Sequence, residues 1–315
     1  MRSTPICALQ VACKEMPLDL RHQYLSLRFK NKIMGSNNHP CRDVYSDSQE
    51  QESGRRTFFK SVHCITTSSM PQLTEIATNY PSLLLQTAPW TIEAPRIDMA
   101  LDSIRRELPP TRQLLAAEYI NSQFSEYEHI YTDGPKSLTG TGSSFFIPSK
   151  GISQSQSNGK FFTSYSAELK GIEMALKWAL ENYKGDILIL TDCQSALSSV
   201  ENFHNSCHHL VTNIINLLHD FRLNRQKIEL MWIPSHSGIP GNEKADKIAK
   251  SATNLPAGET KQITYQEADH WLREEIKKIG TPDTGIRKQP STIDNSSQPY
   301  SKPPAKNTYR ADAKS

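Results

Sequence analysis

The pattern of hydrophobic and polar positions changes at about residue 126 of this 315-residue chain. From there to about residue 254, short apolar runs alternate with stretches of helical spacing, which predicts the order β-β-β-α-β-α-α-β-α. The predicted strands are 127–132, 140–148, 160–163, 186–190 and 228–233. The predicted helices run from an N-cap at Ser166 to about 183, then over 194–201, 211–221 and 241–252.

These elements predict an α/β fold with a five-stranded mixed sheet flanked by helices. Residues 186–190 (Asp-Ile-Leu-Ile-Leu) are apolar almost without interruption, which is typical of a strand buried on both faces. Three strands in succession favour antiparallel pairing, and later strands reached through helices favour parallel pairing.

The rest of the chain carries weaker patterns. Within 1–124, residues 6–35 have helical spacing, 36–57 are polar and predict a linker, and prolines interrupt every pattern over 58–123, so we expect this region to be poorly ordered. Residues 255–280 predict a short helical extension over 266–279. The segment 281–315 is rich in Pro, Ser, Asn and Lys, and we expect it to be disordered.

Composition excludes some classes and leaves others open. The formal net charge of +3 is too small to indicate a nucleic-acid partner by itself. Six scattered cysteines form no C-x-x-C pair, which favours reduced thiols in an intracellular protein over a disulfide framework. No apolar run reaches the length of a membrane span, and the first residues do not resemble a signal peptide.

Four acids fall where the predicted elements could bring them together. Asp133 ends the first strand and Asp192 follows the buried strand, while Glu168 and Asp246 lie near the starts of two helices. Each alone has a structural explanation, such as a turn, a helix cap or a solvated helix face. Together they predict a site for hard divalent cations, since two-metal phosphoryl-transfer sites need several converging carboxylates.

A histidine precedes the last of these acids. His236 lies in a loop bounded by Pro234 and Gly238, which disfavours a core histidine. Near a scissile phosphate such a side chain could activate water or move a proton to the leaving group. A purely structural loop histidine remains the alternative.

Four segments carrying these residues resemble the type 1 ribonuclease H domain, most closely the version in polymerase proteins of non-LTR (jockey-like) retrotransposons. They are Tyr131–Gly134, Ser166–Leu169, Leu190–Leu197 and Trp232–Asp246, and the resemblance covers about 125–254. It implies the ribonuclease H fold, two Mg²⁺ or Mn²⁺ ions, and endonucleolytic cleavage of the RNA strand of RNA–DNA hybrids. Carried over, Asp133, Glu168, Asp192 and Asp246 would be catalytic metal ligands, with His236 as a catalytic loop histidine.

The resemblance extends weakly upstream. Residues 16–21 and 88–90 are similar to the region that connects polymerase and ribonuclease H in such elements, which gives 1–124 the role of a connecting region. The chain has no Tyr-x-Asp-Asp polymerase motif, so a separate reverse transcriptase is a candidate partner. The oligomeric state does not follow from the sequence.

Two departures leave a second function open. Pro135 follows Asp133-Gly134 where the family has a small polar residue, and proline lacks an N–H. Cys193 stands where the family usually has serine. A nucleic-acid-binding relic without cleavage is therefore the alternative, and an integrase-like DNA nuclease is a more distant third. Three alternatives follow for the grip on a hybrid: it is weak, a missing partner domain supplies it, or it comes from the lysines at 136, 150, 160, 170, 244 and 250.

Overall fold

The computed structural model describes residues 16–35, 39–45, 58–69, 88, 91–138, 140–203, 208–256 and 263–280. The expected disordered tail at 281–315, most of the expected linker at 36–57, and the start of the helix expected at 6–35 lie outside the described residues. No helix in the described part of the chain is both long and apolar enough to cross a membrane.

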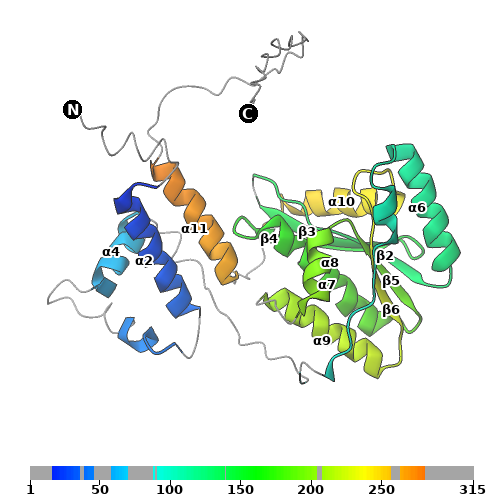
Figure 1. Ribbon diagram of the computed structural model, residues 1–315, viewed down its shortest axis with the longest axis horizontal. Helices are drawn as coiled ribbons and strands as arrows, with labels where there is room; N and C mark the ends of the chain where they lie inside the picture. The colour runs from blue at the N-terminus through cyan, green and yellow to red at the C-terminus, as the bar shows by residue number, and fades with distance from the viewer. Residues whose placement is uncertain are drawn as a thin grey trace, which may run out of the picture. The chain divides into compact units, whose positions relative to one another are not determined.

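Within the described residues, one mixed sheet has the strand order β1-β6-β5-β2-β3-β4. Its strands are β1 (Ile97–Asp98), β2 (Glu128–Asp133), β3 (Thr141–Ile147), β4 (Ile152–Gly159), β5 (Ile187–Thr191) and β6 (Ile228–Trp232). Pairs β2–β3 and β3–β4 are antiparallel, and pairs β2–β5, β5–β6 and β1–β6 are parallel. The mixed sheet flanked by helices is therefore confirmed (Figure 1).

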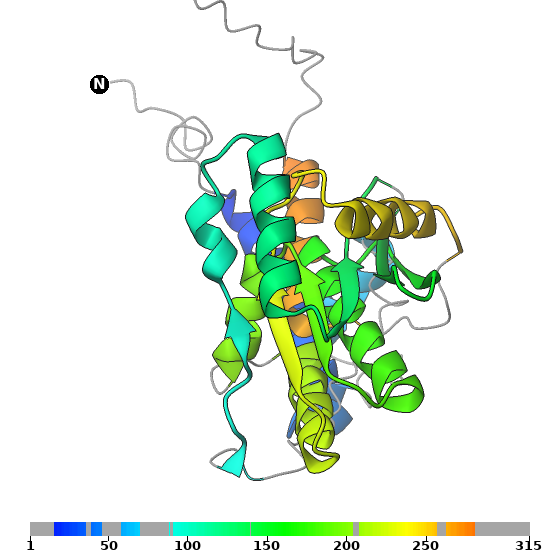
Figure 2. The same cartoon turned by 90° about the vertical axis from the view of Figure 1, so that its right-hand side faces the viewer.

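Two strands differ from the prediction. The third strand is Ile152–Gly159 and not 160–163, which was wrong, because β4 is an edge strand of Ser and Gln that shows no apolar alternation. β1 is a sixth strand of two residues, too short to leave a pattern. Figure 2 shows β1 at the β6 edge of the sheet and β4 at the opposite edge.

The helices flank this sheet as the apolar spacing predicted. They are α7 (Ser164–Asn182), α8 (Gln194–Glu201), α9 (His209–Leu223) and α10 (Pro240–Ala252). The N-cap predicted at Ser166 was wrong: the helix begins at Ser164, and the side chain of Thr163 accepts the backbone N–H of Ser166 at 3.1 Å. Serine and threonine both cap helices, so residue type alone did not separate Thr163 from Ser166.

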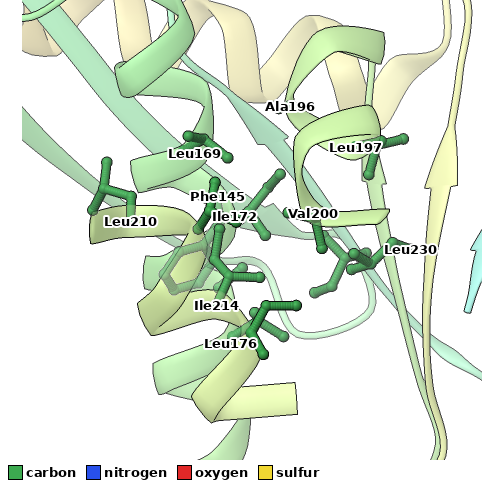
Figure 3. Close-up of a cluster of buried hydrophobic side chains, with 14 of the residues drawn as sticks. Phe145, Leu169, Ile172, Leu176, Ala196, Leu197, Val200, Leu210, Ile214 and Leu230 are labelled. Atoms are coloured by element: carbon green, nitrogen blue, oxygen red, sulfur yellow. The ribbon is translucent and has the colours of Figure 1, made fainter. Parts of the chain in front are cut away.

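The core lies between the sheet and the helices α7, α8 and α9. Figure 3 shows apolar side chains from these helices meeting those of the strands, all of them buried. The labelled residues are Leu169, Ile172 and Leu176 of α7, Ala196, Leu197 and Val200 of α8, Leu210 and Ile214 of α9, Phe145 of β3 and Leu230 of β6. This packing fixes α7 on the sheet.

The part of the chain before residue 125 contributes further elements. A 3₁₀ helix, η2 (Ala100–Ile104), and helix α6 (Pro109–Gln123) follow β1. The prolines at 109 and 110, taken from the sequence as breaks, instead begin α6, where a missing N–H costs nothing. Three further helices are α2 (Leu18–Met34), α4 (Phe58–Ser69) and α11 (Tyr265–Gly280).

Helices α2 and α11, from opposite ends of the described chain, bind each other through polar contacts. The Tyr24 hydroxyl donates to Asp269 Oδ1 at 2.9 Å, and Arg28 Nε donates to the Tyr265 hydroxyl at 2.8 Å. The α11 bounds agree with the helix expected over 266–279 to within one residue at each end.

Candidate functional site

Asp133 and Asp192 lie side by side at the ends of two parallel strands. Asp133 is the last residue of β2, and Asp192 directly follows β5. Thr132 pairs with Thr191 at the end of these two strands, so the two aspartates are the next residues in register. Neighbouring strands are about 4.8 Å apart, which brings these two carboxylates to one edge of the sheet.

Glu168 reaches the same place from α7, because a glycine lets the strand approach the helix. A Cβ added to Gly134 would overlap the backbone of Ala167 and Glu168. One turn later, a Cβ on Gly171 would come within 3.2 Å of the Asp133 carbonyl oxygen. The backbone N–H of Gly134 bonds to the carboxylates of both Asp133 and Glu168. Glu168 and Asp133 are both buried.

Asp246 approaches from α10, in the middle of a row of helix residues one turn apart. Asn242 Nδ2 donates to Asp192 Oδ2 at 3.3 Å, and Lys250 Nζ donates to Asp246 Oδ2 at 2.5 Å. The carboxyl group of Asp246 is therefore tied to its own helix, while its neighbour Asn242 reaches across to Asp192. The spacing 242, 246, 250 places all three on one helix face.

The four carboxylates repel one another. Burial, and then the charges of Asp192 and Asp246, raise the pKa of Asp133 to about 7. Burial, followed by the charges of Asp133 and Asp192, raises the pKa of Glu168 well above its usual range. Burial also raises the pKa of Asp192, against the hydrogen bond from Asn242. All four predicted acids thus lie within electrostatic range of each other.

His236 lies at the rim of this cluster. Its side chain is exposed, and its backbone takes the left-handed conformation with φ of 48°. Burial raises the pKa of Asp192, and the charge of His236 partly offsets that rise, so the ring lies within electrostatic range of that carboxylate. Trp232 Nε1 donates to the Asp192 carbonyl oxygen at 3.0 Å and fixes the backbone there.

The donor set fits a hard divalent cation. Glu168 Oε2 is buried and has no hydrogen-bond partner among the described residues. A cation bound there would pair this oxygen and offset the repulsion that raises the pKa of Asp133. In the described part of the chain, however, no three His, Cys, Asp or Glu side chains already stand close enough to hold a metal. The bonds from Lys250 and Asn242 draw Asp246 and Asp192 to other partners.

Pro135 removes none of the hydrogen bonds found at the site. The N–H that faces the carboxylates is that of Gly134. The Pro135 carbonyl oxygen accepts the N–H of Gly142 at 3.1 Å, and Lys136 then forms a bridge to Thr141. Pro135 thus begins the turn that leads into β3, and at this position its backbone only needs to accept a hydrogen bond.

Three of the lysines expected to grip a hybrid are bound to acids of the protein. Lys150 pairs with Glu128 at 2.6 Å, Lys170 with Glu173 at 2.7 Å, and Lys250 with Asp246. Lys136 and Lys244 are exposed, and Lys160 lies over the Phe161 ring, 4.9 Å from its centroid.

Sequence reasoning missed Asn242 and Trp232 as neighbours of Asp192, and Lys250 as the partner of Asp246. The four-residue spacing of 242, 246 and 250 was a signal that could have found two of them. Nothing in the spacing of Trp232 indicated its bond to the Asp192 carbonyl oxygen.

Residues 125–254 match the family model described as RNase H. The chain therefore contains an RNase H domain over the range that holds all four acids and His236. This confirms the ribonuclease H part of the resemblance, and the retrotransposon origin stays a prediction.

Proposed function

We propose that this protein cleaves the RNA strand of RNA–DNA hybrids, using Asp133, Glu168, Asp192 and Asp246 to hold two Mg²⁺ or Mn²⁺ ions. The observation that carries the proposal is the buried pair of Asp133 and Glu168. Burial and like charges raise the pKa of both, and one oxygen of Glu168 has no partner among the described residues. An arrangement that is costly without a cation is what a cation site needs.

Metal ions held by these four acids would activate water and stabilise the charge that develops on the phosphodiester. The chain's own residues supply the setting. Gly134 donates its N–H to the carboxylates of Asp133 and Glu168 and so links the two acids. Asn242 and Trp232 hold Asp192 by its side chain and its carbonyl.

His236 suits proton transfer at the rim. Its exposed ring beside Asp192 could take a proton from the attacking water or give one to the leaving oxygen.

We also propose that the chain derives from a retrotransposon polymerase protein. In that origin 1–124 are the connecting region, 255–280 a helical extension and 281–315 a tail, and a separate reverse transcriptase would be a partner. The motif segments support this reading.

The test is a cleavage assay with matched RNA–DNA, RNA–RNA and DNA–DNA duplexes in Mg²⁺ and in Mn²⁺. We expect cleavage of the RNA strand of the hybrid alone, reduced at least about 1000-fold by Asp192→Asn. Asp186→Asn is the matched control, because Asp186 precedes the same strand at its other end and pairs with Lys227. Intact hybrid at micromolar wild-type protein in both metals would refute the activity.

A second candidate is hybrid binding without cleavage. The bond between Lys250 and Asp246 favours it, because it withdraws one acid from the cluster. This candidate predicts salt-sensitive binding of hybrid by wild-type protein and no product in either metal.

A further inference from the structure

Two consecutive serines of β3 each bond to a helix on a different face of the sheet. Ser143 Oγ donates to the Ala167 carbonyl oxygen at 2.6 Å, and Ser144 Oγ donates to the Ala245 carbonyl oxygen at 2.8 Å. Both serines are fully buried. Neighbouring strand residues point to opposite faces, so one serine serves α7 and the other serves α10 (Figure 1).

The acceptors are not arbitrary positions of those helices. Ala167 immediately precedes Glu168, and Ala245 immediately precedes Asp246. Each hydroxyl therefore holds a helix at the residue before a candidate metal ligand. Ser144 is moreover the register partner of Asp133 across the β2–β3 pair. Strand β3, which bonds to both helices, therefore also pairs with β2 at Asp133, the third of these acids.

On the α7 face, the direction of the Ser143 hydroxyl is set by a neighbour. Asn158 Nδ2 donates to Ser143 Oγ at 2.7 Å, which leaves the hydroxyl hydrogen for Ala167. Directly after β2, the Gly134 carbonyl oxygen accepts the Ser164 hydroxyl at 3.1 Å. Contacts from β3 and from the residue after β2 therefore fix the first turns of α7, and with them the position of Glu168 relative to the sheet.

On the α10 face, strand and helix match in spacing. A Cβ added to Gly142 would overlap the Ala249 carbonyl oxygen. Gly142 lies two residues before Ser144 on the strand, and Ala249 lies four residues after Ala245 on the helix. Two strand residues rise about 6.6 Å and four helical residues about 6 Å. Glycine and serine of β3 thus contact successive turns of α10, which fixes its position along the strand.

We propose that Ser143 and Ser144 are positioning residues that set Glu168 and Asp246 at the distance from Asp133 that a metal ion requires. The proposal rests on the proposed metal site. A backbone carbonyl inside a helix already takes part in the helix, so the fold alone does not call for a second, buried donor at these two positions.

The experiment compares Ser143→Ala and Ser144→Ala with Ser155→Ala. Ser155 is the register partner of Ser144 on β4 and is exposed, so its replacement controls for loss of a strand hydroxyl. Mn²⁺ affinity is measured by calorimetry, and kcat and KM by hybrid cleavage. We expect about tenfold weaker Mn²⁺ binding and about tenfold lower kcat for the two buried serines. KM should stay within about twofold, because neither serine lies on the surface that would contact hybrid.

Double-mutant cycles separate positioning from loss of stability. In an Asp246→Asn background, Ser144→Ala should weaken Mn²⁺ binding no further, while Ser143→Ala should keep its full effect. The reverse should hold in a Glu168→Gln background. A general loss of fold would not follow this crossed pattern, and thermal unfolding of each variant measures it separately.

The outcomes decide the proposal. Unchanged Mn²⁺ affinity in both alanine variants, or losses that add equally in both backgrounds, would overturn it. If wild-type protein binds Mn²⁺ but leaves hybrid intact, the proposed activity fails while the cycles still decide the role of the serines. If wild-type protein binds no Mn²⁺, both proposals are overturned.

Discussion

The four acids form two unlike pairs. Asp133 and Glu168 are buried, and among the described residues neither forms an ion pair with a basic side chain. Asp192 and Asp246 are half-buried and have partners from α10, since Asn242 donates to one and Lys250 to the other. We refer to the first two as the inner pair and to the other two as the outer pair.

The difference shows which acids the protein can satisfy by itself. Asn242 and Lys250 donate side-chain hydrogen bonds to the outer pair, whereas the inner pair has the Gly134 N–H against burial and mutual repulsion. A bound cation would act most strongly on the inner pair, because no basic side chain of the described residues forms an ion pair with either acid. Four predictions test whether this contrast is real.

The largest effect is expected on catalysis. Asp133→Asn should lower kcat at least about 1000-fold, because it removes a charge from the pair without a partner. Asp246→Asn should lower kcat only about 10- to 100-fold, since an amide oxygen remains and the charge was already paired with Lys250. Single-turnover cleavage of hybrid measures both. Equal losses would show that the pair with Lys250 does not lessen the part that Asp246 plays in catalysis.

The next effect concerns the pH dependence of metal binding. Asp133 must lose its proton to bind a cation, and its pKa is raised to about 7. Between pH 6 and pH 8 the Mn²⁺ affinity of the wild-type protein should therefore rise about tenfold. Calorimetric titrations at these two pH values check this, with Asp133→Asn as control. A flat profile in the wild-type protein would contradict it.

A third effect is on stability without metal. The pKa of Asp133 in the folded protein lies above the unfolded value, so its proton stabilises the fold at low pH and this contribution is lost as pH rises through about 7. In EDTA at pH 8, Asp133→Asn should therefore be more stable than wild type by about 1 kcal/mol, a Tm rise of about 2–4 °C.

The same measurement has two internal controls. At pH 3 both folded and unfolded Asp133 are largely protonated, so the gain should vanish. Asp246→Asn should show no gain at pH 8, because it breaks the pair with Lys250. A lower Tm for Asp133→Asn at pH 8 would mean that its charge is stabilised by something other than metal.

The smallest effect is expected at Lys250, whose side chain is 58% exposed. Lys250→Ala should change the free energy of unfolding by less than about 1 kcal/mol. Mn²⁺ should bind about two- to threefold more tightly, because a competing positive charge is removed from Asp246. Lys247→Ala, an exposed lysine on the same helix, is the matched control. Weaker Mn²⁺ binding in Lys250→Ala alone would show that Lys250 supports the site.

The sequence predicted those parts of the fold whose apolar pattern reports burial. β5 is buried along its whole length, and α7 carries a long apolar stripe, so both were found. β4 is a polar edge strand, β1 has two residues, and α6 begins with prolines, so each lacked the signal that pattern reading requires. Edge and boundary elements depend on tertiary pairing more than on their own residues.

The candidate site divides in the same way. The positions of Asp133 and Asp192 at strand ends followed from the strands themselves. The bonds from Ser143 and Ser144 could not be predicted, because they depend on the register of β3 against β2 and on how closely two helices approach it. The overlap that Gly134 avoids likewise appears only once α7 is placed on the sheet.

The two-residue strand β1 has a practical consequence for any shortened form of the protein. Ile97 and Asp98 pair in parallel with Leu230 and Met231, so β6 is hydrogen-bonded on both sides. A fragment that began at residue 125, where the RNase H match begins, would leave one side of β6 with unpaired backbone groups. Exposed strand edges promote aggregation, so we expect fragments that begin before residue 97 to stay monodisperse where shorter ones precipitate.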